Sequence, residues 1–166
     1  NQINSYFDAM LFMSMISGRN PQYLIGEQVI SAPIIKDLGI ETISTGYILI
    51  DGGVQSMVQV MSDTNPIPMD RIDAIIAHAL AAQYLGMKLI YLEAGSGATK
   101  SINDDIIKSV SKVIDIPLII GGGLRDPEIV SAKVNSGASI IVTGTITEED
   151  SSIMREIASA VHWKNQ

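Results

Sequence analysis

The stretch Lys88-Leu-Ile-Tyr-Leu-Glu-Ala-Gly-Ser-Gly97 decides the fold. A short apolar run leads into a glycine-rich segment, a pattern typical of a buried parallel strand that ends in a loop. Because side chains alternate along a strand, we expect Leu89, Tyr91 and Glu93 on one face and residues 90, 92 and 94 on the other. A carboxylate at the mouth of such a strand indicates either a ligand site or an ion pair with a lysine, and both interpretations stay open at this point.

Length and composition narrow the possible classes of protein. A chain of 166 residues with 46% hydrophobic and 17% charged residues can bury one substantial core, so we expect a single domain over residues 1–166. The net charge of −7 argues against a nucleic-acid partner. The absence of cysteine excludes a disulfide framework and cysteine-ligated zinc. No apolar run reaches membrane-spanning length and no signal-peptide pattern heads the sequence, so we expect a cytoplasmic protein.

Strand and helix patterns alternate along the chain, which predicts an α/β fold with a parallel sheet. Besides the stretch quoted above, strands are expected at residues 8–16, 41–50, 116–120 and 139–143. Helices are expected at residues 21–38, 70–86, 103–114, 126–137 and 148–161. We expect Pro33 to bend or restart the first helix, Asp70 to cap the second, and Asp126-Pro127 to begin the fourth. Glu148, Glu149 and Asp150 are placed in the first turn of the last helix.

The connection over residues 51–69 is long for a compact α/β fold and predicts a lid or substrate loop. It carries apolar side chains, which a solvated loop would avoid. We expect its segment 54–61 to form part of an apolar wall.

Five strands fit two architectures: an open doubly wound sheet, or part of a (β/α)8 TIM barrel whose first three strands are absent from the sequence. The chain begins at Asn1, only a few residues before a buried strand, which favours the barrel. In that arrangement the strand edges are unpaired, and we expect Met10, Phe12 and Tyr47 to be exposed on the side that faces the barrel interior.

Two glycine motifs, Gly121-Gly-Gly123 and Gly144-Thr145, follow the last two strands about 20 residues apart. Glycine lets backbone N–H groups approach an anion, and a following helix start would add a favourable dipole. The pair predicts a phosphate site. Three further residues have structural interpretations: Arg125 as a brace for its helix, His78 as a solvated or core-satisfied residue, and Trp163 as an interface anchor or a cover on the core.

At this point the residues carry a resemblance. Tyr91-Leu-Glu-Ala-Gly-Ser-Gly-Ala98, Gly121-Gly-Gly-Leu-Arg-Asp-Pro-Glu128 and Ile141-Val-Thr-Gly-Thr-Ile-Thr-Glu-Glu-Asp150 resemble the geranylgeranylglyceryl phosphate synthase family. Leu11-Phe-Met-Ser-Met-Ile-Ser-Gly-Arg-Asn-Pro21 and Thr45-Gly-Tyr-Ile-Leu-Ile50 are similar to the fourth and fifth strands of that family. The resemblance covers essentially the whole chain. It implies a prenyltransferase of archaeal-type phospholipid biosynthesis, a modified TIM barrel that joins a polyprenyl diphosphate to sn-glycerol-1-phosphate through an ether bond; related bacterial enzymes make heptaprenylglyceryl phosphate.

The resemblance also implies roles for particular residues. Tyr91, Glu93 and Ser96 would hold the glycerol phosphate, with Tyr91 and Glu93 as the catalytic pair. The backbone of the two glycine motifs would wrap the phosphate group, through Gly122, Gly123, Gly144 and Thr145. Thr145 departs from the asparagine often found there in bacterial relatives.

Cofactor and partners follow from the same resemblance. Mg²⁺ is implied as the cofactor, with its aspartate ligand expected in the first strands that this sequence lacks, so no metal ligand can be named. The implied partners are sn-glycerol-1-phosphate, a polyprenyl diphosphate and a second copy of the chain in a homo-oligomer. Transient membrane contact is expected because the prenyl chain comes from a membrane, and the 166-residue chain by itself is expected to be inactive.

Two alternatives remain open. Another phosphate-binding barrel enzyme, of the phosphosugar isomerase or aldolase type, would share the glycine motifs, although it would normally carry other catalytic groups at the strand ends. The second alternative is a truncated barrel that binds a phosphometabolite without catalysis.

Overall fold

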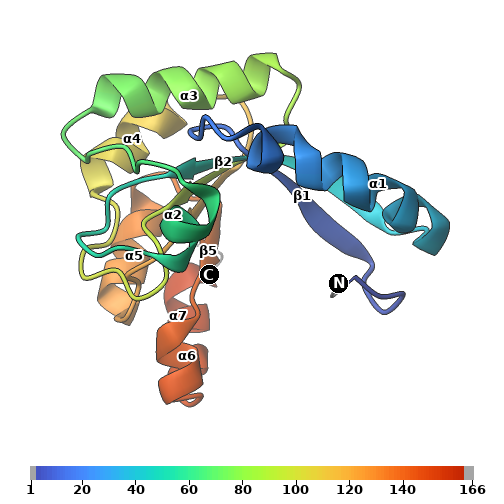
Figure 1. The fold of residues 1–166 in the computed structure, drawn as a ribbon. Coiled ribbons are helices and arrows are strands. Elements are labelled where there is room, and N and C mark those ends of the chain that lie inside the picture. Colours follow the sequence, from blue (N-terminus) through green and yellow to red (C-terminus); the bar gives the residue numbers. More distant parts are fainter. Residues whose placement is uncertain (1–2, 163–166) are drawn as a thin grey trace.

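The structure, a computed structural model, describes residues 3–162. Strands and helices alternate over these residues (Figure 1). The strands are β1 (Ala9–Met15), β2 (Glu41–Leu49), β3 (Leu89–Glu93), β4 (Leu118–Gly121) and β5 (Ile140–Val142). The helices are the π-helix η1 (Gln22–Gly26), α1 (Glu27–Leu38), α2 (Met57–Ser62), α3 (Ile72–Tyr84), α4 (Asp104–Ser111), α5 (Pro127–Asn135), α6 (Thr145–Glu149) and α7 (Ile153–His162).

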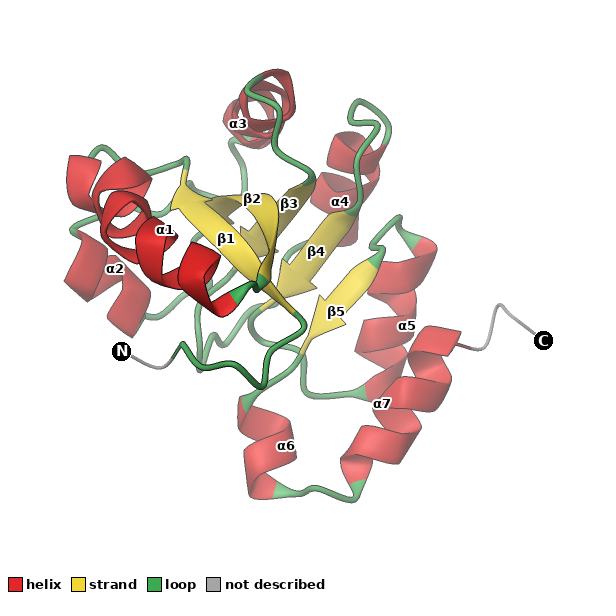
Figure 2. Cartoon of the chain, turned by 90° about the vertical axis from the view of Figure 1, so that its right-hand side faces the viewer, coloured by secondary structure: helices red, strands yellow, loops and turns green. Residues whose placement is uncertain are grey.

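The five strands form one parallel sheet in the order β1-β2-β3-β4-β5. A doubly wound sheet would reverse its strand order at a switch point. Here every connection steps to the next strand in the same direction, as in a barrel. Figure 2 shows the sheet with helices α3, α4, α5 and α7 around its outer side. The predicted α/β fold with five parallel strands is therefore confirmed, and the strand order favours the barrel over the doubly wound alternative.

The alternation predicted for the central strand is also confirmed. Ile90 and Leu92 belong to the larger apolar cluster, which packs β2, β3 and β4 against the helices. Leu89 and Tyr91 belong to a smaller cluster on the opposite, inner face of the sheet. The inner cluster consists of Met15, Tyr47, Leu49, Leu89, Tyr91 and Ile119. The inner face therefore carries the tyrosine and the strand-end carboxylate, while the helices bury the outer face.

The expectation for the barrel-facing side chains is wrong in two respects. Met10 and Phe12 pair in register with Thr42 and Ser44, on the helix side of the sheet, because a shift of one residue moves a side chain to the opposite face. Tyr47 does face inward, but it is buried at 8% exposure and not left open. It is covered because residues outside the sheet, including Val58 of α2, pack on the inner cluster.

Local sequence signals explain the start of α5 but not that of α3. The Asp126 side chain accepts hydrogen bonds from the backbone N–H groups of Glu128 (2.7 Å) and Ile129 (3.4 Å), and Pro127 occupies the first turn of α5 as predicted. Helix α3 differs from the prediction, because its N-cap position is Arg71 and not Asp70.

The first helical segment changes character before Pro33, not at it. The π-helix η1 gives way to α1 at Glu27, and Pro33 lies inside α1. Proline removes one helical N–H donor, which leaves the Val29 carbonyl without its usual partner. Val29 is on the solvent side of the helix, so water can satisfy that carbonyl. The expected restart at Pro33 is therefore not seen.

The connection over residues 51–69 contains the helix α2, which sequence reasoning missed. Ser56 caps this helix through its hydroxyl, which accepts a hydrogen bond from the Gln59 N–H at 3.2 Å. The segment then returns to the end of β2, where Ile67 N–H donates to the Leu49 carbonyl at 2.9 Å. The connection is therefore tied to the sheet edge next to the site described below.

The single last helix of the prediction is two helices, α6 and α7. Asp150 adopts an extended backbone between them, and its carboxylate accepts hydrogen bonds from the N–H and hydroxyl of Ser152. Glu148 lies within α6 and Asp150 ends it, so the expected acidic first turn of one long helix is wrong. Trp163 lies outside the described residues. None of the described helices is long and apolar enough to cross a membrane.

Candidate active site

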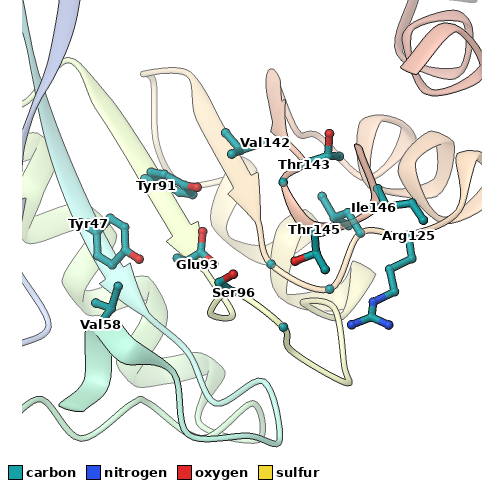
Figure 3. A pocket seen from close by; sticks show the side chains of 15 residues that line it. Tyr47, Val58, Tyr91, Glu93, Ser96, Arg125, Val142, Thr143, Thr145 and Ile146 are labelled. Carbon is teal, nitrogen blue, oxygen red and sulfur yellow. The ribbon is translucent and has the colours of Figure 1, made fainter. Parts of the chain in front are cut away.

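A pocket of about 260 Å³ opens at the carboxyl ends of β3, β4 and β5 (Figure 3). Parallel pairing aligns Glu93 with Gly121 and Gly121 with Val142, so the loops that follow these strands meet at one edge of the sheet. All seven residues predicted for the site line this pocket: Tyr91, Glu93, Ser96, Gly122, Gly123, Gly144 and Thr145. The structure thus brings together residues that lie up to 54 positions apart in the sequence (145 − 91).

Among residues 3–162, Glu93 is the only carboxylate on the pocket wall, and it is 7% exposed. Its Oε1 atom accepts a hydrogen bond from the Gly95 N–H at 2.7 Å, and the Tyr91 hydroxyl donates to the same carboxylate. Burial raises the pKa of Glu93, while the bonds from Tyr91 and Gly95 oppose that rise only in part. Within residues 3–162 no lysine or arginine pairs with it, so the simple ion-pair interpretation is wrong.

Two tyrosines stand beside this carboxylate. The rings of Tyr47 and Tyr91 meet edge to face with their centroids 5.1 Å apart. Burial, reinforced by the nearby Glu93 charge, holds the pKa of both phenols far above the usual range. Both therefore remain neutral hydrogen-bond donors at any physiological pH. Sequence reasoning missed Tyr47 as a site residue, because its position opposite Tyr91 depends on the register between β2 and β3.

The Gly121-Gly-Gly123 motif is required by close packing at the exit of β4. A Cβ atom on Gly121 would lie 2.5 Å from both the Tyr91 hydroxyl and Glu93 Oε2. Gly122 has φ +85°, and a Cβ there would lie 2.8 Å from the Gly95 nitrogen. The backbone N–H groups of Gly122 and Gly123 donate no hydrogen bond to any other residue in the described range. These groups are available to an anion in the pocket.

The helix dipoles expected behind the two glycine motifs are weak. Asp126 already occupies the N-terminus of α5, and α6 is only five residues long with Glu148 in its first turn. Arg125, predicted to brace its helix, instead lines the pocket and has no ion pair with any described residue. Its side chain lies at one end of the pocket, with Thr145 between it and Glu93 (Figure 3).

A second, apolar pocket of about 330 Å³ adjoins the first and shares Tyr47 and Val58 with it. The remaining lining residues are Met13, Met15, Tyr23, Gln28 and Ser62. Of the segment 54–61 predicted to form an apolar wall, only Val58 reaches either pocket, while Val54, Met57, Val60 and Met61 are exposed. Met13 and Tyr23 could not be found from sequence, since strand register and the turn into η1 bring them here.

The described residues do not form a magnesium site of their own. No group of three His, Asp or Glu side chains within residues 3–162 could hold a metal ion, and Glu93 is the single carboxylate of the pocket. His78 lies outside the pocket, and its Nδ1 atom is 2.7 Å from the Ala74 carbonyl oxygen, consistent with a satisfied helix residue.

Comparison with known proteins identifies the family. A sequence profile of the PcrB family matches residues 1–161. The chain belongs to the PcrB family. It is 47% identical over 162 residues to a geranylgeranylglyceryl phosphate synthase of Chitinophaga pinensis and 45% identical over 154 residues to one of Methanopyrus kandleri, covering 98% and 93% of this chain.

Solved PcrB-family structures have the same fold. The synthase of Thermoplasma acidophilum in complex with its substrate sn-glycerol-1-phosphate matches 96% of this chain at 36% identity, with a TM-score of 0.89. The wild-type enzyme of Thermoplasma volcanium matches with a TM-score of 0.88 at 37% identity. The five strands thus match part of the TIM barrel of the family. The chain spans 64% of the length of the Chitinophaga and Methanopyrus relatives and of both Thermoplasma chains.

Proposed function

We propose that this chain carries the glycerol-phosphate half of a prenyltransferase site that joins a polyprenyl diphosphate to sn-glycerol-1-phosphate. The observation that carries the proposal is the single pocket in which Glu93, Tyr91 and both glycine motifs meet, next to an apolar pocket. The Thermoplasma acidophilum relative was solved with sn-glycerol-1-phosphate, which supports this acceptor. A polar pocket beside an apolar one suits a reaction between a small phosphate ester and a hydrocarbon chain.

In the proposed mechanism the protein positions the acceptor and removes its proton. The free N–H groups of Gly122 and Gly123, with the backbone at Gly144 and Thr145, hold the phosphate, and Ser96 adds a hydroxyl contact. The glycerol 3-hydroxyl then points to Glu93. Its oxygen forms the new ether bond to the allylic carbon as the bond from that carbon to the diphosphate breaks, and its proton passes to Glu93.

The environment of Glu93 suits that task. A carboxylate whose pKa is raised by burial is a stronger base than an exposed one, while the bonds from Tyr91 and Gly95 keep it oriented. The apolar pocket behind Tyr47 and Val58 would take the first part of the prenyl chain. Mg²⁺ is implied by the family resemblance and would offset the charge of the leaving diphosphate.

The remaining properties stay predictions. A cytoplasmic location, a homo-oligomer and transient membrane contact are proposed for the protein, the last because α2 exposes Met57, Val60 and Met61 beside the pocket. Family membership favours the prenyltransferase over the phosphosugar isomerase or aldolase alternative. A non-catalytic phosphometabolite-binding protein is the outcome that the following experiment would detect.

The test is Glu93→Gln in a full-length protein that carries this chain, assayed with radiolabelled polyprenyl diphosphate, sn-glycerol-1-phosphate and Mg²⁺. We expect prenyl transfer to fall by about 10²-fold or more, the usual contribution of a general base. Glu128→Gln, an exposed glutamate in α5, is the matched control and should retain activity. Activity of the Glu93 variant within a few-fold of the parent would contradict the role of Glu93. No activity in the parent would favour the non-catalytic alternative.

A further inference from the structure

A positive charge would strengthen phosphate binding in this pocket, and the glycine motifs do not supply one. A phosphate monoester carries about −1.5 to −2 charges at neutral pH. The protein itself has a net charge of −7, and Glu93 adds a negative charge on the pocket wall. Fifteen residues line the pocket, and only Arg125 among them is cationic.

The helix N-termini nearby do not fill this need. In α5 the first free N–H groups already donate to the Asp126 carboxylate, so that end of the helix is neutralised. In α6 the short length gives little dipole, and Glu148 in the first turn opposes it. The remaining source of positive charge on the pocket wall is a side chain.

Arg125 is placed and unengaged for that task. It lies in the loop between Gly123 and the capping residue Asp126, so the same turn that presents the glycine N–H groups also presents its guanidinium. The side chain is exposed and makes no hydrogen bond or ion pair with another described residue. In Figure 3, Arg125 lies at one end of the pocket wall and Thr145 lies between it and Glu93.

We propose that Arg125 is the positioning residue that binds the phosphate dianion at one end of the pocket and thereby directs the hydroxyl end of the acceptor toward Glu93. This inference rests on the proposed function and deepens it, because it names Arg125 as the residue that makes the site prefer a phosphate dianion. Arginine suits the place because its planar guanidinium can donate two parallel hydrogen bonds to phosphate oxygens. The pocket then has one cationic end and one basic end, and a bound phosphate ester has a single favourable orientation.

The test measures binding of inorganic phosphate and of sn-glycerol-1-phosphate by titration calorimetry, separately from activity. Arg125→Gln should raise the Kd for both anions by about tenfold or more, which corresponds to about 1.4 kcal/mol, the low end for a charged hydrogen bond. Arg155→Gln, which removes the same charge from the exposed face of α7, is the matched control and should leave Kd within about twofold because its charge is screened. Arg125→Lys should recover part of the affinity.

The pH dependence of phosphate binding and the steady-state kinetics give two further tests. Because the second pKa of a phosphate monoester is about 6, the difference in Kd between parent and Arg125→Gln should shrink as the pH falls below that value. In full-length enzyme, Arg125→Gln should raise KM for sn-glycerol-1-phosphate more than it lowers kcat, as expected for a residue that binds rather than reacts.

The outcomes separate the two proposals. Equal phosphate Kd values for the parent and Arg125→Gln, or an equal loss in Arg155→Gln, would overturn the role of Arg125 while leaving the pocket assignment intact. If the parent bound neither phosphate nor sn-glycerol-1-phosphate, the proposed function would fail and the role of Arg125 would fail with it.

Discussion

Tyr47 and Tyr91 are direct partners across the β2–β3 ladder, and their rings meet edge to face at 65° with centroids 5.1 Å apart. This pair closes the inner face of the sheet beside Glu93 and separates the polar pocket from the apolar one, since Tyr47 lines both. Edge-to-face contact of this kind adds about 0.5–1.5 kcal/mol to simple burial. Burial beside this pair raises the pKa of Glu93, although the hydrogen bond from the Tyr91 hydroxyl opposes that rise.

Glu93 is expected to cost stability at neutral pH. Because its pKa is raised in the folded state, the folded protein binds this proton more tightly than the unfolded chain does. This proton stabilises the folded protein fully at a pH below the pKa that Glu93 has in the unfolded chain. The stabilisation is lost as the pH rises through the higher pKa that Glu93 has in the folded protein. The parent should therefore lose stability relative to Glu93→Gln as the pH rises from about 4 to about 8, because glutamine does not ionise. The difference appears as a higher free energy of unfolding for the variant.

Urea denaturation of both proteins across that range is the measurement, with exposed Glu128→Gln as the control. A variant that loses stability relative to the parent with rising pH would show that Glu93 is favourably ionised in the folded state, contrary to the structure.

Tyr91→Phe is expected to change the titration of Glu93. The Tyr91 hydroxyl bond lowers the pKa of Glu93, so its removal should raise that pKa further. In full-length enzyme the acidic limb of the kcat/KM profile should move to higher pH. A ¹³C NMR titration of labelled glutamate, with Glu93→Gln used to assign the signal, measures the shift directly.

Tyr47→Phe is the companion variant, because Tyr47 keeps the ring contact with Tyr91 but has no hydrogen bond to Glu93. In Tyr47→Phe the pKa of Glu93 should be nearly the same as in the parent. Equal titration curves for Tyr91→Phe and the parent would show that the hydroxyl does not contact the ionised carboxylate in solution.

Gly121→Ala is expected to destabilise the fold more than Gly144→Ala does. A methyl group on Gly121 would lie 2.5 Å from both the Tyr91 hydroxyl and Glu93 Oε2, whereas one on Gly144 would meet no atom within 4 Å. We expect Gly121→Ala to destabilise the fold by about 1–3 kcal/mol and to weaken phosphate binding. Thermal unfolding of the two variants tests the difference in stability, and phosphate titration of Gly121→Ala tests the loss of binding. Similar behaviour of both would mean that β4 can move away from Glu93.

The printed 166-residue chain is expected to bind phosphate but not to catalyse prenyl transfer. It spans 64% of the length of the Chitinophaga and Methanopyrus relatives, and among the described residues Arg125 is the only cation on the pocket wall to meet a leaving diphosphate. Strands β1 and β5 each have one neighbour within the described residues, so their free edges should also promote association. An assay of the purified chain with Mg²⁺, combined with sedimentation analysis, tests both points. Turnover by a monodisperse monomer would contradict them.

The sequence by itself determined the five strands and the polar core of the candidate site. Alternation along the Leu89–Glu93 strand assigned Tyr91 and Glu93 to one face, because side-chain direction in a strand is a local property. The capping of α5 by Asp126 and the glycine motifs after the last two strands were readable for the same reason. Parallel strands end at one edge of their sheet, so the seven predicted residues met in one pocket.

The tertiary structure alone decided which residues from other strands and loops join that core. Tyr47 stands opposite Tyr91, and Met13 reaches the apolar pocket, because pairing between strands sets their positions; a shift of one residue put Met10 and Phe12 on the other face. Arg125 lines the pocket, a position that depends on how the loop after β4 packs. Local patterns carry the direction of a side chain within its own element, whereas contacts between elements depend on register and packing, which only the folded chain defines.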